Sequence, residues 1–353
     1  MNAFNETKKF IILGILTSVV FIVTIFVVNF YQRNKPEVKK TTETQEDIEV
    51  IANNLNTPWE VAFLPDGEIL VTEKDGNLLL IKGELKIPIK GVKPIGEGGL
   101  LGLAVHPDFQ NNKYIYLYYT YSSTENDTLN RVVRFKLENS KLINETVLVE
   151  AIPGAINHNG GRIKFGPDNF LYITTGDAQN PSLAQDKNSL AGKILRVIDE
   201  GNVEMYSYGH RNPQGLAWDN NGQLWATEHG QQAMDELNLI EKGKNYGWPI
   251  IQGDQIQAEM VSPIIQSGVT ATWAPASVVY LKGSLFFGGL RGESLFEYKV
   301  ADKTLKRYFQ GEFGRIRAVV LDPNDNLYIT TSNTDGRGNP SKNDDKLIRV
   351  TVY

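Results

Sequence analysis

One phrase recurs six times along the 353-residue chain and limits the possible folds more than any other feature. Each copy holds an apolar run, a Pro-Asp or Asp/Asn-Gly turn, and an alternating strand that ends in Thr or Gly. Asp, Asn and Gly supply the backbone freedom that a tight turn needs. The copies are VAFLPDGEILVTE from Val61, LAVHPDFQNNKYIYLYYT from Leu103, IKFGPDNFLYITTGD from Ile163, LAWDNNGQLWATEHG from Leu216, VVYLKGSLFFGGL from Val278 and VVLDPNDNLYITTSN from Val319.

Six copies at a spacing of roughly 40–60 residues predict an all-β protein, a six-bladed β-propeller over residues 49–353. Closing the ring covers the apolar face that each blade alone would expose. We expect the last strand, KLIRVTVY, to complete the first blade beside residues 48–52. A β-sandwich would not explain six similar phrases, and no Gly-x-Gly-x-x-Gly follows a strand and opens a helix, as a dinucleotide-binding fold requires.

The N-terminal part differs from the rest of the chain. After a short tail (residues 1–9), the uncharged run FIILGILTSVVFIVTIFVVNFY at residues 10–31 is long enough to cross a membrane as one helix. No Ala-x-Ala-like site follows it, which favours an uncleaved transmembrane anchor over a cleaved signal peptide. Residues 32–48 are polar and predict a flexible linker. Two lysines precede the run and four basic residues follow it, so the positive-inside count opposes export of the C-terminal part, although large domains can translocate despite flanking charge.

Composition excludes several classes of protein. The chain has no cysteine, so disulfide scaffolds, cysteine zinc sites, thiol catalysis and c-type haem attachment are ruled out. Its net charge of -5, with scattered Lys and Arg, argues against a nucleic-acid-binding protein. The four histidines, at positions 106, 158, 210 and 229, lack the short-range pairing of zinc ligands.

Loops at one end of a propeller converge on the central channel, so unusual polar phrases there indicate a site. His158 lies between two Asn residues and is a candidate general base, although a turn histidine is an equally simple interpretation. Asp177 follows a strand and a Gly and could orient that imidazole. The loop phrase EHGQQAMDE offers oxygen ligands that suit calcium, although such loops are more often only solvated.

Four arginines, at positions 211, 291, 315 and 317, form a second candidate group. Arg211 could stabilise developing negative charge or pair with a neighbouring acid. Arg315 and Arg317 alternate along a strand and so face the same side, with no equal set of acids nearby in sequence. Together with Arg291 they would suit a ligand with several carboxylates.

The phrases GLLGLAVHPDF, HNGGR, GHRNPQGLAW, DELN and NYGWP, in this order, resemble the glucose/sorbosone dehydrogenase family over residues 50–353. Its members include soluble quinoprotein glucose dehydrogenases and aldose sugar dehydrogenases that use pyrroloquinoline quinone (PQQ). The resemblance implies PQQ- and calcium-dependent oxidation of the C1 hydroxyl of an aldose to a lactone. Electrons would pass to a separate acceptor, since the chain carries no haem site.

The resemblance also implies roles for individual residues. His158 would be the base, Asp177 would hold its imidazole, and Arg211 would lie against the quinone. Trp273 would contact the sugar. The remaining implied cofactor contacts are Glu97, Asn212, Thr272, Arg291, Arg315 and Arg317, and the implied calcium ligands are the carbonyls of Gly230 and Gln231 and, for a second ion, Glu236 and the Tyr246 carbonyl.

This sequence departs from the family pattern at three of those positions. Glu97 stands where the glucose dehydrogenases have Gln, which places a carboxyl group near an anionic cofactor. Gln231 replaces Pro, and Arg291 replaces Lys, which differs from Arg in hydrogen-bonding geometry. Two other functions stay open: a calcium-dependent lactonase, and a non-catalytic propeller that binds carbohydrate or protein at the cell surface. An exported enzyme of this family would place the propeller outside the cytoplasm, anchored by the single span.

Overall fold

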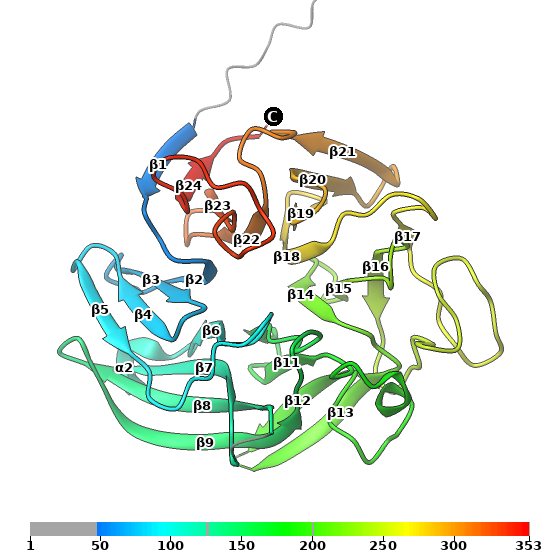
Figure 1. The fold of residues 1–353 in the computed structure, drawn as a ribbon, viewed down its shortest axis with the longest axis horizontal. Helices are drawn as coiled ribbons and strands as arrows, with labels where there is room; N and C mark the ends of the chain where they lie inside the picture. Colours follow the sequence, from blue (N-terminus) through cyan, green and yellow to red (C-terminus); the bar gives the residue numbers. More distant parts are fainter. Residues whose placement is uncertain (1–47, 125–126, 200, 353) are drawn as a thin grey trace, which may run out of the picture. The chain divides into compact units, whose positions relative to one another are not determined.

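Six pairs of short strands, one for each repeated phrase, form the inner halves of six four-stranded antiparallel sheets arranged in a ring (Figure 1). The computed structural model describes residues 48–124, 127–199 and 201–352. The sheets are the blades of a six-bladed β-propeller, and the predicted all-β fold is therefore confirmed. The innermost strands are β2 (Pro58–Phe63), β6 (Leu100–Val105), β10 (Ile163–Phe165), β14 (Pro213–Trp218), β18 (Pro275–Leu281) and β22 (Ile316–Leu321).

The second strand of each pair follows the tight turn of its phrase. Left-handed backbone lies at these turns, for example at Gly67 (φ 86°), Asn169 (φ 62°) and Asp325 (φ 62°), which explains their Gly, Asn and Asp. The second strands are β3 (Ile69–Glu73), β7 (Tyr114–Tyr121), β11 (Leu171–Thr175), β15 (Leu224–Glu228), β19 (Ser284–Gly289) and β23 (Leu327–Thr331). A short helix, α2 (Phe109–Asn112), fills the turn before β7.

Outer strands complete each blade. They are β4 (Asn77–Leu80), β5 (Leu85–Pro88), β8 (Leu129–Glu138), β9 (Lys141–Pro153), β12 (Lys193–Asp199), β13 (Asn202–Tyr208), β16 (Glu236–Ile240), β17 (Ile265–Gln266), β20 (Ser294–Lys299), β21 (Thr304–Tyr308), β24 (Leu347–Val350) and β1 (Ile48–Ala52). A 3-10 turn at Pro181–Ala184 precedes β12.

The apolar core lies between neighbouring blades. One cluster joins Leu70 and Leu78 of the first blade to Leu100, Ile115 and Leu117 of the second, and all five side chains are fully buried. Burying one such side chain contributes about 1.5–3 kcal/mol, so each blade depends on its neighbour for most of its stability. This packing leaves the polar ends of the innermost strands around the central channel.

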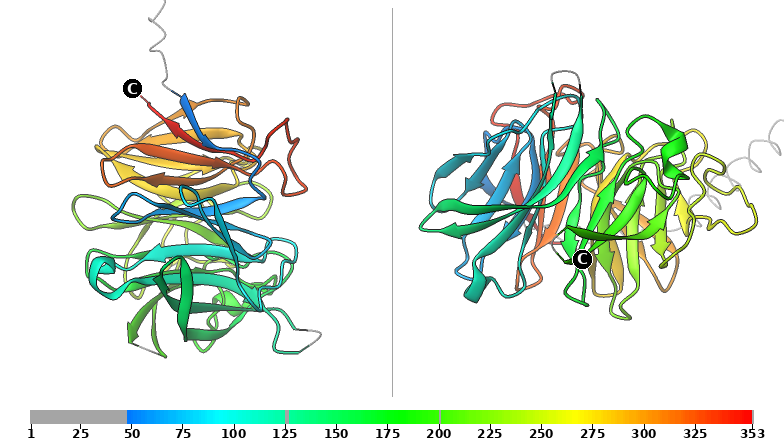
Figure 2. Two further views of the ribbon diagram at one scale, coloured as in Figure 1. Left: turned by 90° about the vertical axis from the view of Figure 1, so that its left-hand side faces the viewer. Right: turned by 90° about the horizontal axis from the view of Figure 1, so that it is seen from below.

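The ring closes through its two terminal strands. β1 pairs with β24 in an antiparallel ladder that sets Ile48 opposite Val350 and Val50 opposite Ile348. The side view in Figure 2 shows β1, in blue, against the red C-terminal strand. The pairing is as expected, but the predicted blade was wrong: β24 and β1 complete the sheet of β22 and β23, not the first blade. The sixth phrase and the residues after it supply only three strands, β22, β23 and β24, so β1 adds the fourth strand of that blade.

The predicted tail, membrane anchor at residues 10–31 and most of the linker lie outside the described residues. Within the described ranges, no helix is long and apolar enough to cross a membrane. The anchor therefore stays a prediction from the sequence.

Candidate active site

A cavity of about 380 Å³ opens at the end of the channel where the innermost strands begin. Its walls come from the loops that precede β6, β10, β14, β18 and β22 and from those that follow β15, β19 and β23. The lining residues are Glu97, Asn157, His158, Arg211, Gln214, His229, Gly230, Gln231, Gln232, Asp235, Thr272, Ala274, Leu290, Arg291, Arg315, Arg317 and Arg337. Nine of the residues chosen from the sequence are thus brought together from five blades.

His158 and Asp177 form a hydrogen-bonded pair on the cavity wall. The Nδ1 atom of His158 lies 2.7 Å from Asp177 Oδ1, and Asp177 is fully buried behind the ring. The other carboxylate oxygen accepts a hydrogen bond from Trp248 Nε1 at 2.8 Å. An ionised carboxylate only accepts, so Nδ1 carries the proton and Nε2 keeps a lone pair. The arrangement is that of an oriented general base.

The backbone around His158 is tightly constrained. His158 has left-handed backbone (φ 62°), and a Cβ on Gly176 would lie 1.9 Å from the His158 carbonyl oxygen. Only glycine fits at position 176, because the two chain segments touch there. The Thr-Thr-Gly-Asp phrase therefore places both the carboxylate and the loop that carries the imidazole.

Glu97 is ion-paired at the rim of the cavity. Its Oε1 lies 2.7 Å from Arg337 Nη1, and its Oε2 accepts the backbone N–H of His158 at 3.0 Å. Arg337 also donates to Asn157 Oδ1 at 2.8 Å. Burial opposes ionisation of Glu97, but the charge of His229 and the hydrogen bonds from Arg337 and His158 together lower its pKa to about 2. Glu97 is therefore a carboxylate whose charge Arg337 compensates.

Arg211 lies beside the His158–Asp177 pair. Its guanidinium is 5.4 Å from the centre of the Trp248 ring, and its Nη1 donates to the His229 carbonyl at 3.3 Å. Burial lowers the pKa of Arg211, while the charges of Asp177 and Glu228 raise it. Its Nε is buried and has no hydrogen-bond partner in the part of the chain that the structure describes. Asn212 does not line the cavity: its Oδ1 accepts the Gly160 N–H at 3.0 Å, behind the His158 loop.

Arg315 and Arg317 share one acid that the local sequence did not reveal. Asp335, in the loop after β23, lies 2.8 Å from Arg315 Nη2 and 3.6 Å from Arg317 Nη2. Arg315 also donates to the carbonyls of Ser332 and Leu290, at 3.2 and 3.0 Å. Among the described residues, these two buried guanidinium groups therefore share one carboxylate as their ion-pair partner.

Arg317 is the less firmly held of the two. Its Nε donates to Ser332 Oγ at 3.1 Å, and its contact with Gln214 Oε1 is long, at 3.4 Å. Burial lowers its pKa to about 10, against the opposing charge of Asp335. A guanidinium that is poorly compensated and faces a cavity is suited to bind an anion.

The segment before β18 contributes Thr272 but not Trp273. Thr272 lines the cavity and donates to Asp235 Oδ2 at 2.7 Å. Trp273 is only 3% exposed, and its ring packs 5.6 Å from Phe287 and 5.7 Å from Phe296. The prediction that Trp273 contacts the sugar does not agree with this position, because the aromatic core of the blade takes up its indole.

The predicted calcium ligands fall into two places. Gly230 and Gln231 line the main cavity, and within the described residues neither carbonyl accepts a hydrogen bond. Glu236 and Tyr246 line an adjoining space of about 10 Å³, the size of one small ion or water. Burial, and then the charge of Glu228, raise the pKa of Glu236 to about 8. The Gly230 and Gln231 carbonyls in the main cavity are oxygen donors that suit calcium. The carboxyl groups of Glu228 and Glu236, beside the smaller space, are a second set of such donors.

The cavity also fits an anion with several carboxylates. Five arginines line it against two acids, Glu97 and Asp235. Three buried polar atoms at or behind its wall have no hydrogen-bond partner among the described residues: the donors Arg211 Nε and Asn212 Nδ2, and the ring nitrogen His229 Nε2. Unpartnered buried donors are costly unless a ligand satisfies them.

Sequence reasoning missed several residues of this wall, above all Arg337, His229 and Asp235. Asp235 accepts the backbone N–H groups of Gly230, Trp273 and Ala274 and so ties two loops together. A signal for Arg337 was present: Asp177 ends the third phrase, and the loop that follows the end of the sixth phrase begins with TDGRG.

Comparisons with known proteins give a consistent result. The family model for Glucose / Sorbosone dehydrogenase matches residues 55–349. The aldose sugar dehydrogenase YliI of Escherichia coli is 31% identical over 342 residues, which cover 82% of this chain and 91% of that protein. Quinoprotein glucose dehydrogenase B of Acinetobacter calcoaceticus is 33% identical over 253 residues, covering 59% of this chain and 53% of that one.

A solved structure matches the whole propeller. The PQQ-bound form of an aldose sugar dehydrogenase from Streptomyces coelicolor superimposes with a TM-score of 0.79 and 38% sequence identity. The match covers 87% of this chain and 98% of that one. The six-bladed arrangement and the sequence relationship therefore extend over the same residues.

Proposed function

The chain belongs to the glucose/sorbosone dehydrogenase family, and from that premise we propose that it oxidises the C1 hydroxyl of aldose sugars to lactones with PQQ and calcium. The observation that carries the proposal is the His158–Asp177 pair, 2.7 Å apart, on the wall of a cavity lined by five arginines. A base and an anion-binding pocket in one cavity are what this reaction needs. The acceptor of the electrons is a separate molecule.

The protein's own groups have defined tasks in this proposal. His158 takes the proton of the C1 hydroxyl at Nε2, and Asp177 holds the ring and stabilises the imidazolium that forms. The C1 hydrogen leaves with its electron pair, so the carbon is oxidised and the ring oxygen and C1 become part of a lactone. When bound, PQQ supplies the acceptor for this hydride and calcium supplies a Lewis acid.

The basic residues hold the cofactor. Arg317 and Arg291 would pair with carboxylates, and Arg211 with its unpartnered Nε would face negative charge on the cofactor. The carbonyls of Gly230 and Gln231 would bind calcium at the cavity, and Glu236 would bind a second ion next to it. Among the described residues, the Gly230 and Gln231 carbonyls accept no hydrogen bond and Arg211 Nε has no partner.

The lactonase alternative has less support. It needs a divalent ion surrounded by side-chain carboxylates, and among the described residues no group of three or more His, Cys, Asp or Glu is placed to hold one. The lining of the main cavity, with five arginines and two acids, does not supply such a ring of carboxylates. The non-catalytic alternative would not require an oriented imidazole.

One assay separates these functions. Purified full-length protein is incubated with PQQ and calcium, and reduction of a redox dye is followed with a panel of aldoses. We expect dye reduction that requires sugar, PQQ and calcium together. Lactone hydrolysis without PQQ would support the lactonase, and no turnover with either substrate would contradict both enzymes.

We also propose that residues 10–31 anchor the chain with the propeller outside the cytoplasm. The support is the long uncharged run in the sequence and the exported character of the resembled family. Protease added to intact cells should degrade the propeller while cytoplasmic markers survive. A propeller protected until the cells are lysed would contradict this orientation.

A further inference from the structure

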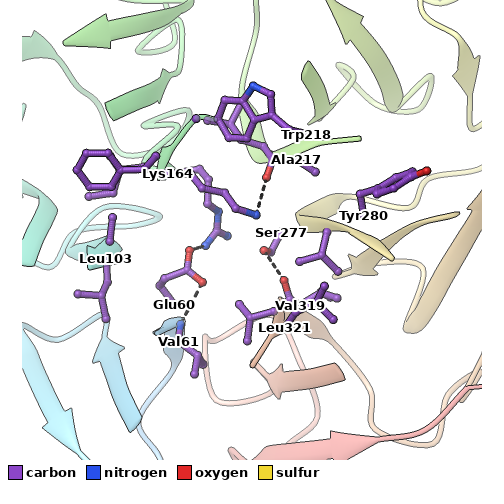
Figure 3. Close-up of a pocket in the computed structure, with 18 of the residues that line it drawn as sticks. Glu60, Val61, Leu103, Lys164, Ala217, Trp218, Ser277, Tyr280, Val319 and Leu321 are labelled. Carbon is purple, nitrogen blue, oxygen red and sulfur yellow. Dashed lines mark hydrogen bonds and ion pairs between the residues drawn. The ribbon is translucent and has the colours of Figure 1, made fainter. Parts of the chain in front are cut away.

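A second cavity, of about 540 Å³, lies at the other end of the channel, where the innermost strands end (Figure 3). All six innermost strands contribute to it, and no residue lines both cavities. Figure 3 shows Glu60, Lys164, Trp218 and Tyr280 around the opening. None of these residues takes part in the chemistry proposed above, so a ligand in this cavity is independent of the proposed function.

Arg162 and Glu60 form a buried pair in the wall of this cavity. Arg162 is 2% exposed; its Nη1 contacts Glu60 Oε2, and its Nε donates to the Gln214 carbonyl at 2.8 Å. Glu60 Oε1 accepts the Val61 N–H at 3.0 Å. Glu60 is the one acid among the lining residues, and it is committed to Arg162. The Nη2 of Arg162 is buried and has no hydrogen-bond partner among the described residues.

Lys164 adds a second positive charge. Its Nζ donates to the Leu216 carbonyl at 3.3 Å, and among the described residues no carboxylate forms an ion pair with it. Burial, and then the charge of Arg162, lower the pKa of Lys164 to about 8. The amine is still largely protonated at pH 7, so the cavity holds two cations against one anion.

Most of the other side chains that line this cavity are aliphatic or aromatic. Aromatic and aliphatic side chains surround the charged groups, among them Leu103, Phe165, Trp218, Tyr280, Val320 and Leu321. A small, strongly hydrated ion would leave these surfaces exposed to water, whereas an organic anion would cover them. The excess of one positive charge matches a single carboxylate.

We propose that this cavity is a binding site for an organic monocarboxylate, whose carboxylate pairs with Lys164 and the free Nη2 of Arg162 while its apolar body lies against Trp218 and Tyr280. The site is separate from the sugar-oxidising cavity.

The test uses benzoate, titrated into the full-length protein by calorimetry at pH 7. The variant Lys164→Met keeps the length of the side chain and removes its charge, and the exposed Lys306 on β21 supplies the matched control Lys306→Met. Arg317→Gln reports on the other cavity, where benzoate also meets arginines. Thermal unfolding checks that each variant is folded.

We expect saturable binding that Lys164→Met weakens at least tenfold, the effect of losing one charge-assisted hydrogen bond. Lys306→Met should leave it unchanged, and Arg317→Gln should leave the Lys164-dependent component of binding unchanged. Affinity should also fall as the pH rises through about 8, because Lys164 then loses its charge.

Four results would overturn the proposal. They are no saturable binding, binding that Lys164→Met does not alter, binding that Arg317→Gln abolishes, and equal affinity for neutral benzamide or for inorganic phosphate. Loss of dye-reducing activity in Lys164→Met is not expected, and that assay tests the proposed function independently of this site.

Discussion

Glu97 and Arg337, 240 positions apart in the sequence, form an ion pair of 2.7 Å at the rim of the active-site cavity. The same carboxylate accepts the backbone N–H of His158, so the pair also holds the loop that carries the candidate base. A glutamate next to an anionic cofactor would repel it if its charge were not compensated. Arg337 therefore explains how this chain accommodates Glu97 where the resembled enzymes have Gln.

Removing Arg337 alone should weaken cofactor binding. In Arg337→Gln the charge of Glu97 is left uncompensated, and we expect PQQ affinity to fall by about tenfold, or roughly 1.4 kcal/mol. The double variant Glu97→Gln/Arg337→Gln should recover most of this loss, because the repelling charge is gone. Fluorescence titration with PQQ across the four proteins measures the coupling. Equal losses in the single and double variants would contradict this role for Arg337.

The same pair predicts a pH effect on stability. The pKa of Glu97 is lowered to about 2 in the folded protein from an ordinary 4.5, so the unfolded chain binds this proton first on acidification. The contribution of the Glu97 charge to the free energy of unfolding is therefore fully present above about pH 5 and is lost as the pH falls towards 2. The difference in free energy of unfolding between wild type and Glu97→Gln, from urea denaturation, should shrink over this range. A pH-independent difference would show that the Glu97 charge contributes little.

His158 should be essential for turnover but not for folding. His158→Asn keeps a residue that tolerates left-handed backbone and removes the base, so we expect turnover to fall about 10²–10⁴-fold. PQQ should still bind. The matched control His106→Asn changes a histidine that does not line the cavity and should leave turnover unchanged. Wild-type dye reduction by His158→Asn would remove His158 from the mechanism.

Arg315 and Arg317 should differ in what their loss affects. Arg315 is held by Asp335 and two carbonyls, so Arg315→Gln should mainly lower the free energy of unfolding, by about 2–4 kcal/mol. Arg317 is poorly compensated, so Arg317→Gln should mainly weaken PQQ binding, by roughly 10–150-fold. Thermal unfolding without cofactor and PQQ titration separate the two effects. If Arg315→Gln mainly weakened PQQ binding and Arg317→Gln mainly lowered the free energy of unfolding, these assignments would be wrong.

When calcium is removed, the free energy of unfolding should depend on the protonation state of Glu236. Its raised pKa of about 8 means that the unfolded chain ionises first, above about pH 4.5, while the folded protein stays protonated. Without calcium, stability should therefore fall as the pH rises from about 5 to 8, and calcium should restore it at pH 8. Melting temperatures in chelator and in calcium measure this.

The controls for this experiment are two glutamine substitutions. Glu236→Gln should remove the pH effect and the part of the calcium effect that grows between pH 5 and 8. Glu145→Gln, on the exposed part of β9, should change neither. A pH-dependent calcium response that survives in Glu236→Gln would place the second ion away from Glu236.

The sequence alone determined the blade count, because each blade is local: its strand pair and its turn come from one continuous phrase such as IKFGPDNFLYITTGD. It also made candidates of His158, Asp177 and four of the five cavity arginines, since their motifs are contiguous. The blade that β1 completes, the shared Asp335 and the Glu97–Arg337 pair were decided by ring closure, which joins residues from distant blades. Trp273 shows the same limit, because its direction depends on the packing of Phe287 and Phe296 and not on its position in the sequence. Local patterns specify strands and turns, whereas charge pairing and side-chain direction at the channel depend on contacts that exist only once the six blades have packed together.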